Sequence, residues 1–157
     1  MRRILIGVAA IAAVAASVPA MAVSASAAAT PAPHKTLIHT VVGDYYGNPS
    51  DAIGPASQAS PDACANPGSQ RTSFTTSIPS NWQTLDARRG PFQGCAVKGE
   101  WHTGDAFHVS RITYGGQTIC LHPSLHSGPA SSVWYLTPKG WSWSGGTSDA
   151  VWNTSCQ

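Results

Sequence analysis

Short runs of alternating apolar and polar residues fill residues 81–157, and turn-forming residues interrupt them about every 8–12 positions. In Ala106–Tyr114 (AFHVSRITY) the alternation places Phe107 and Val109 on one face of a strand, and Gly115-Gly116 then predicts a hairpin turn. No stretch after residue 27 shows the 3.6-residue apolar period of a helix. Several short strands without a helix favour a small all-β barrel. Further strands are expected at Ala96–Lys98, Gln117–Leu121, Val133–Leu136, Trp141–Ser144 and Ala150–Trp152.

Residues 28–80 have a different texture and form an N-terminal extension with short strands and one long loop. Thr36–Tyr46 (TLIHTVVGDYY) is rich in β-branched and aromatic residues and predicts one strand, or a bent pair broken at Gly43. Arg71–Ile78 predicts another strand. Between them, Asn48–Gln70 is rich in Pro, Ser, Gly and Ala, which is typical of a loop.

The first 27 residues are typical of a secretory signal peptide. Arg2 and Arg3 precede an apolar core, Ile4–Val18, and the small residues Ala25-Ser26-Ala27 form a cleavage site before Ala28. The apolar core is too short to span a bilayer, which needs about 20 residues. The segment therefore predicts a secreted protein.

Net charge argues against a nucleic-acid partner, and hydropathy argues against a membrane. The chain carries a formal charge of +2, but Arg2 and Arg3 supply that whole excess, so the mature chain is formally neutral. A neutral chain lacks the Lys/Arg excess on which nucleic-acid binding depends. No second apolar stretch is long enough for a membrane helix, so we expect no membrane contact after signal cleavage.

All four cysteines, Cys64, Cys95, Cys120 and Cys156, lie in the exported part. An even number in a small exported domain favours two disulfides, although the sequence leaves three pairings open. No CxxC motif occurs, which argues against a zinc knuckle or a thioredoxin-like redox site. We expect Cys64 to tie the N-terminal extension to the barrel.

The second half of the chain resembles a known family. Leu85–Pro91 (LDARRGP) resembles the opening motif of bacterial SH3-like (SH3b) domains, secreted actinobacterial type, and the resemblance extends over about Trp82–Trp152. It implies that residues 81–157 form an SH3-like barrel. In cell-wall hydrolases such domains bind peptidoglycan peptides, so the resemblance also implies a wall or peptide ligand. The later landmarks that agree with the family in order are Val97, Gly99, Gly104, Phe107, Val109, Trp134, Gly140 and Trp141.

Motifs for catalysis or metal binding are missing from the sequence. There is no G-x-S-x-G, no H-E-x-x-H and no Gly-rich phosphate loop. Glu100 and Asp105 are the close acidic pair of a Trp-bearing region, but Asp105 also fits a turn-stabilising role beside His102. His122 and His126 are spaced for a metal only on a helix, and Pro123 lies between them. The sequence thus favours a non-enzymatic protein with no metal and no cofactor.

Six tryptophans are the most informative excess. We assign Trp82, Trp134 and Trp152 to the core. Trp141 and Trp143 share one strand face by period two, and form either an exposed platform or a lid on the core. If that face is exposed, the ligand-binding surface comprises Trp101, Tyr135, Trp141 and Trp143.

Two functions follow from these patterns. The first is a secreted SH3-like module that recognises cell-wall peptidoglycan or an extracellular peptide through this aromatic surface. The alternative is a secreted, disulfide-bridged protease inhibitor that presents Ala59–Gly68 or His122–Pro129 as a rigid loop. A small hydrolase is a third possibility, but it would need a nucleophile that the sequence does not reveal.

Overall fold

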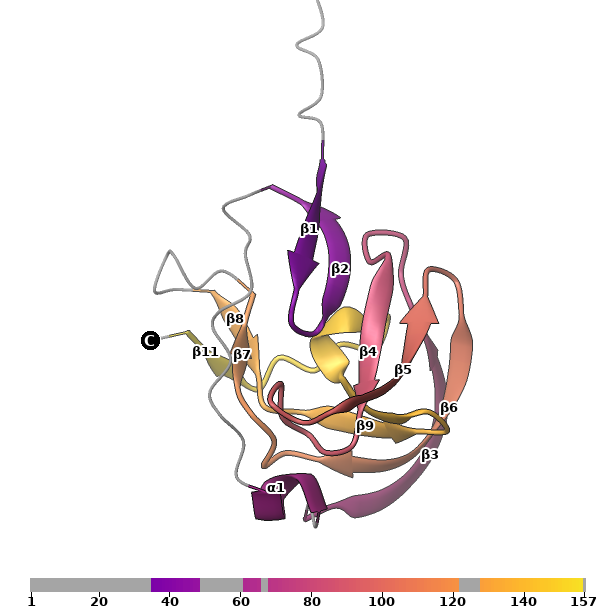
Figure 1. Ribbon diagram of the computed structural model, residues 1–157, viewed down its shortest axis with the longest axis vertical. Helices are drawn as coiled ribbons and strands as arrows, with labels where there is room; N and C mark the ends of the chain where they lie inside the picture. The colour runs from indigo at the N-terminus through magenta and orange to yellow at the C-terminus, as the bar shows by residue number, and fades with distance from the viewer. Residues whose placement is uncertain (1–34, 49–60, 66–67, 122–127, 157) are drawn as a thin grey trace, which may run out of the picture. The chain divides into compact units, whose positions relative to one another are not determined.

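The computed structural model describes residues 35–48, 61–65, 68–121 and 128–156 (Figure 1). The expected signal peptide, residues 1–27, lies outside the described residues. No helix in the described ranges is long and apolar enough to cross a membrane.

Strands dominate the structure, and its helical pieces are single turns. The elements in order are β1 (Thr36–Thr40), β2 (Gly43–Gly47), α1 (Pro61–Ala65), β3 (Gln70–Ser77), β4 (Thr84–Arg88), β5 (Val97–His102), β6 (Ala106–Thr113), β7 (Ile119–Cys120), β8 (Pro129–Ser131), β9 (Trp134–Thr137), β10 (Gly140–Trp143), the 3-10 turn η3 (Ser144–Gly146) and β11 (Thr154–Ser155). The prediction of an all-β fold is confirmed.

The strands pair into three antiparallel sheets (Figure 1). The largest has six strands in the order β3-β6-β9-β10-β4-β5, and the others have the orders β1-β2 and β11-β8-β7. Within the described part of the chain, the edge strands β3 and β5 do not pair with each other, so the large sheet is open and is not a closed barrel. Strand β3 comes from the expected extension and pairs along β6, which makes the extension part of this sheet.

The N-terminal hairpin β1–β2 confirms the predicted bent pair, with its register running from Thr36↔Gly47 to Thr40↔Gly43. Gly43 has a φ of +129°, and a Cβ atom there would lie 2.1 Å from the Thr84 carbonyl oxygen. Only glycine permits both the backbone conformation and this close approach. The hairpin therefore packs directly on the first residues of β4, Thr84 and Leu85.

Two predictions for the C-terminal half are wrong. Gly115-Gly116 does not close a hairpin: β6 pairs with β3 and β9, and β7 pairs with β8. Gly116 instead lies against the Trp134 indole, where a Cβ would come within 2.2 Å of Cδ1. Ala150–Trp152 is not a strand; the last strand is β11, which pairs with β8.

The core is built on large aromatic residues. Trp82 and Trp134 are buried as predicted, with 2% and 0% exposure. Trp152 is 40% exposed, so its assignment to the core is wrong. It lies between η3 and β11, outside the strands of the large sheet, and its ring packs on Trp143.

Two disulfides join the four cysteines, Cys64–Cys95 and Cys120–Cys156. The first ties α1 to the loop after β4, which confirms that Cys64 links the extension to the rest of the fold. The second links β7 to the end of the described chain. In the chain-entropy picture each bridge contributes about 2–4 kcal/mol by restricting the unfolded chain.

Candidate functional site

The four aromatic residues expected to bind a ligand are buried. Their exposures are 8% for Trp101, 1% for Tyr135, 5% for Trp141 and 0% for Trp143. Ser142, between the two tryptophans of β10, is also fully buried, so both faces of this strand are covered. Trp141 and Trp143 therefore belong to the core, and no exposed platform forms at these positions.

Trp101 is engaged by neighbours on both sides. Its ring stacks on Phe107, with ring centroids 4.4 Å apart, and the Lys139 Nζ atom lies 4.0 Å from the ring centroid. Its Nε1 donates a hydrogen bond of 3.3 Å to the Thr137 hydroxyl. These intramolecular contacts satisfy the indole without a ligand.

Tyr135 and Trp143 also use their polar atoms internally. The Tyr135 hydroxyl donates to the Asp149 carbonyl oxygen at 2.6 Å, and burial raises the pKa of this phenol to about 12. The Trp143 Nε1 donates to the Ser131 carbonyl oxygen at 3.1 Å. Both residues stabilise the fold through satisfied buried polar groups.

Two other aromatic residues reach solvent at a common pocket. Tyr46 and Trp152 are 41% and 40% exposed, and both line a cavity of about 290 Å³ whose lining also includes the buried Trp82. On one side the pocket is lined by β2, and on another by Leu121, which follows β7, and Trp152, which precedes β11. Its described lining residues are Lys35, Tyr45, Tyr46, Gly47, Asn48, Asn81, Trp82, Leu121, Gly145 and Trp152.

Alternation along β2 places Tyr46 at this pocket. Tyr45 points inward and packs on Trp82, with ring centroids 5.0 Å apart, so the next residue points outward. The Tyr46 backbone N–H donates to the Asn81 carbonyl oxygen at 2.7 Å. Two further backbone bonds dock the hairpin: Gln83 N donates to Asp44 O, and Asp86 N donates to Val42 O.

Trp152 and its neighbour Asn153 contact the rest of the fold beside the pocket. Its ring packs edge-on against Trp143, with centroids 5.7 Å apart and an interplanar angle of 76°. The next residue, Asn153, accepts from the Ser132 backbone N–H at 3.0 Å and donates to the Ser132 hydroxyl at 2.9 Å. The chain then enters β11 and reaches the Cys120–Cys156 bridge.

The polar groups of the pocket are an ammonium group and amides. Among the described lining residues, Lys35 alone carries a charge. Asn48 and Asn81 bring exposed side-chain amides, which both donate and accept hydrogen bonds. Aromatic rings beside amides and one cation suit a ligand with an apolar face, amide or hydroxyl groups and a negative charge.

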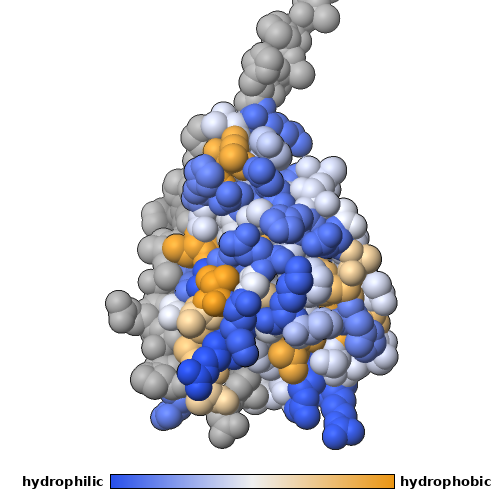
Figure 2. Space-filling view, turned by 45° about the vertical axis from the view of Figure 1, so that its right-hand side comes forward, coloured by the Kyte–Doolittle hydropathy of each residue, from blue (hydrophilic) through white to orange (hydrophobic). Residues whose placement is uncertain are grey.

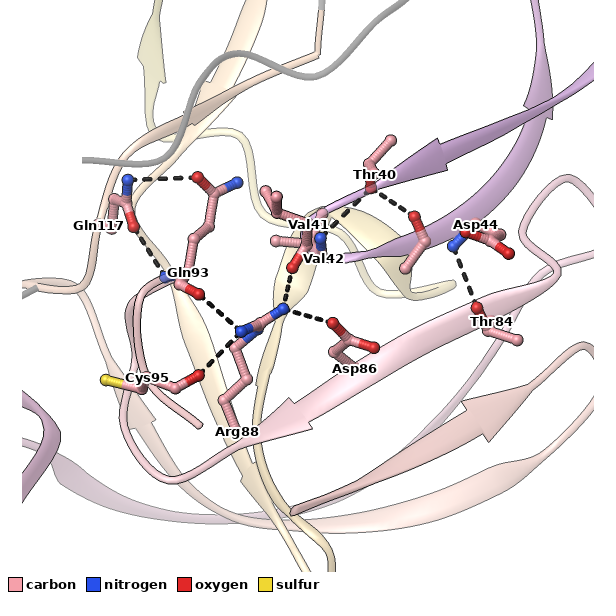
Figure 3. A network of polar contacts seen from close by, with 11 residues as sticks. Thr40, Val41, Val42, Asp44, Thr84, Asp86, Arg88, Gln93, Cys95 and Gln117 are labelled. Atoms are coloured by element: carbon pink, nitrogen blue, oxygen red, sulfur yellow. Dashed lines mark hydrogen bonds and ion pairs between the residues drawn. The ribbon is translucent and has the colours of Figure 1, made fainter. Parts of the chain in front are cut away.

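A buried arginine ties the hairpin to the neighbouring loop (Figure 3). Arg88 Nη1 donates to the carbonyl oxygens of Gln93 and Cys95, at 2.6 and 2.8 Å. Its Nη2 donates to the Val41 carbonyl oxygen and to the Asp86 carboxylate. Burial raises the pKa of Asp86, although the Arg88 charge and hydrogen bond act in the opposite direction. One guanidinium thus joins the hairpin turn, β4 and the loop of the Cys64–Cys95 bridge.

The acidic pair Glu100 and Asp105 is not brought together as a paired-acid site among the described residues. Asp105 stabilises a turn, because its carboxylate accepts from the His102 backbone N–H at 3.0 Å, and Glu100 lies exposed on β5. No group of three or more His, Cys, Asp or Glu in the described ranges could hold a metal ion. His122 and His126 lie outside the described residues, as do residues 59–60 and 66–67 of the predicted loop Ala59–Gly68; Pro61–Ala65 of that loop forms α1.

On the face drawn in Figure 2, hydrophilic residues predominate, and hydrophobic ones form small separate patches.

Sequence reasoning missed Tyr46, Asn81 and Lys35 as site residues. The TLIHTVVGDYY pattern held a signal for Tyr46, since strand alternation places two adjacent tyrosines on opposite faces.

Comparison of the chain with protein-family models, with curated proteins and with solved structures finds no significant match.

Proposed function

We propose that this protein is an exported, non-enzymatic binding module that recognises cell-wall peptidoglycan through the pocket between Tyr46 and Trp152. The observation that carries this proposal is the exposure of these two aromatic side chains on one pocket, above buried aromatic neighbours. Exposed aromatic rings that are supported from below offer a rigid stacking surface at a small cost in conformational entropy.

The size and chemistry of the pocket support a polymeric saccharide ligand. A volume of about 290 Å³ is at the lower end for ligand sites, so it suits one ring of a longer chain. A sugar ring offers an apolar C–H face to Tyr46 or Trp152. Its acylamino and hydroxyl groups match the Asn81 amide, and the carboxylates of peptidoglycan match Lys35.

Two further features support export and a binding role. Disulfides are typical of extracellular proteins, and both pairs form here. The LDARRGP segment that resembles SH3b domains forms β4 and the following turn, where Leu85, Ala87 and Arg88 are buried. We propose that the resemblance is one of fold and wall binding, with the ligand contacted at a different aromatic surface.

Co-sedimentation with isolated peptidoglycan sacculi tests the proposal. The oxidised protein should pellet with the sacculi, and Tyr46→Ala and Trp152→Ala should each weaken binding by about tenfold. Tyr114→Ala is the matched control, because Tyr114 is 52% exposed and does not line the pocket. Parent protein that stays in the supernatant, or equal binding by all four proteins, contradicts the proposal.

Competition identifies the part of the wall that is bound. Soluble oligosaccharides of N-acylated amino sugars should displace the protein from sacculi, and free stem peptides should not. Displacement by the peptides alone assigns the pocket to a peptide ligand instead. Release of soluble wall fragments by the purified protein would contradict the non-enzymatic role.

A further inference from the structure

We propose that the Cys120–Cys156 disulfide positions the pocket wall, so that the binding site is complete only after this bond has formed. The inference rests on the proposed function and adds a control on the same site. It makes ligand binding a property of the oxidised protein.

The disulfide joins two segments that each supply a lining residue. Cys120 is followed directly by Leu121, which lines the pocket. Cys156 closes the C-terminal segment that carries Trp152. The bond therefore fixes the two segments relative to each other on one side of the pocket.

The C-terminal segment packs through Val151 and Trp152, and its hydrogen bonds in the described residues lie mostly at its surface. The Trp152 ring contacts Trp143, the Val151 carbonyl oxygen accepts from the Ser144 hydroxyl at 3.5 Å, and the Cys156 backbone N–H donates to the Gly128 carbonyl oxygen at 3.1 Å. Strand β11 has two residues, both exposed, which pair with Ala130 and Pro129 of β8. The Asn153 amide adds two hydrogen bonds to Ser132. Strands this short are marginal alone, and chain termini lose order unless something ties them down. We infer that these contacts alone do not keep Trp152 in place.

Tyr46, the other aromatic residue of the pocket, does not depend on this bond. Its hairpin is docked by backbone hydrogen bonds to residues 81–86 and by Arg88. Reduction of Cys120–Cys156 should thus release Trp152 and leave Tyr46 in position. The binding site would lose one of its two stacking rings.

The second disulfide provides an internal comparison. Cys64 and Cys95 do not line the pocket, and no described lining residue directly neighbours either of them in sequence. If the disulfides acted on binding only through the stability of the whole protein, removal of either bond would weaken binding. A positioning role is specific to Cys120–Cys156.

The redox step is thiol–disulfide exchange. The two thiols lose two protons and two electrons to a disulfide-bearing oxidant, which is reduced to a dithiol, and an S–S bond forms between Cys120 and Cys156. An oxidising exterior supplies such conditions, so binding would begin after export.

The test compares Cys120→Ser/Cys156→Ser with Cys64→Ser/Cys95→Ser, in sedimentation with sacculi and in amide hydrogen exchange. We expect the first variant to bind about tenfold or more weakly and to exchange faster at residues 150–156. The second should bind within about twofold of the parent. Equal binding by both variants, or unchanged exchange at 150–156, overturns the inference.

A third variant keeps the inference testable if the Cys120→Ser/Cys156→Ser protein does not fold. Asn153→Ala removes the side-chain tether and keeps the disulfide, so it should bind within about twofold of the parent. A loss as large as tenfold would assign the positioning role to Asn153 and overturn the inference. If the parent itself does not bind sacculi, the proposed function fails, and hydrogen exchange still tests the positioning of residues 150–156.

Discussion

Trp152 packs edge-on against Trp143, with ring centroids 5.7 Å apart, so an exposed indole stands on a fully buried one. These two tryptophans are in contact but have different roles, one in the core and one at the surface. Trp143 fills the core between Trp82 and Trp152, whereas Trp152 presents its free side to the pocket.

This division predicts opposite outcomes for the two alanine variants. Trp143→Ala should destabilise the protein by about 3–5 kcal/mol, because it empties a fully buried site. Trp152→Ala should cost about 1 kcal/mol or less and act mainly on binding. Urea unfolding of both variants measures the difference. Equal losses of stability would show that Trp152 is a core residue after all.

The buried guanidinium of Arg88 should be a major contributor to stability. Arg88→Met leaves the Asp86 carboxylate and three carbonyl oxygens without this donor, so we expect a loss of about 3–5 kcal/mol. The neighbouring Arg89 is exposed, and Arg89→Met should stay within about 0.5 kcal/mol of the parent. Similar unfolding midpoints for the two variants in guanidinium chloride would contradict this role.

The raised pKa of Asp86 gives stability a defined pH dependence. Because the folded carboxyl holds its proton more firmly than the unfolded one, its contribution is greatest below pH 3.8 and is lost as the pH rises through the raised pKa. Asp86→Asn removes this dependence. The free energy of unfolding of the parent, relative to Asp86→Asn, should therefore fall as the pH rises over this interval. A relative rise would mean that the Arg88 charge outweighs burial and lowers the pKa of Asp86.

Much of the fold could be predicted from strand periodicity. The alternation in Ala106–Tyr114 and the break at Gly43 correspond to β6 and to the β1–β2 hairpin. Long-range pairing was harder to predict. Gly115-Gly116 matched a hairpin signal, but Gly116 is required by its close approach to Trp134, which only the folded structure reveals.

The aromatic site could not be placed from periodicity, because alternation says which residues share a face and not whether that face is covered. Trp141 and Trp143 do share a face of β10, but the serine between them is buried as well. The sequence offers no signal that separates the exposed Trp152 from the buried Trp82 and Trp134. The exposure of Trp152 results from the path of the chain between η3 and the Cys120–Cys156 bridge.

The docking of the N-terminal hairpin should depend on Gly43 for steric reasons. Gly43→Ala combines a φ of +129° with a clash against Thr84, and strain alone should cost about 1–3 kcal/mol. Gly104→Ala is the matched control, because Gly104 has a φ of +84° but open space around it. Hydrogen exchange at residues 43–47 should increase in the first variant only. Equal increases there would show that the close approach to Thr84 does not matter.

The central claim, that ligand is bound between Tyr46 and Trp152, is tested most directly by NMR. Soluble, N-acylated peptidoglycan oligosaccharides are titrated into the oxidised protein while the indole N–H signals of its six tryptophans are followed. We predict that the Trp152 indole shifts, together with the backbone amides of residues 45–48 and 81–82, while Trp101 and Trp141 stay unchanged. Shifts centred on Trp101 and Trp141, or no shift at Trp152, would contradict the proposed site.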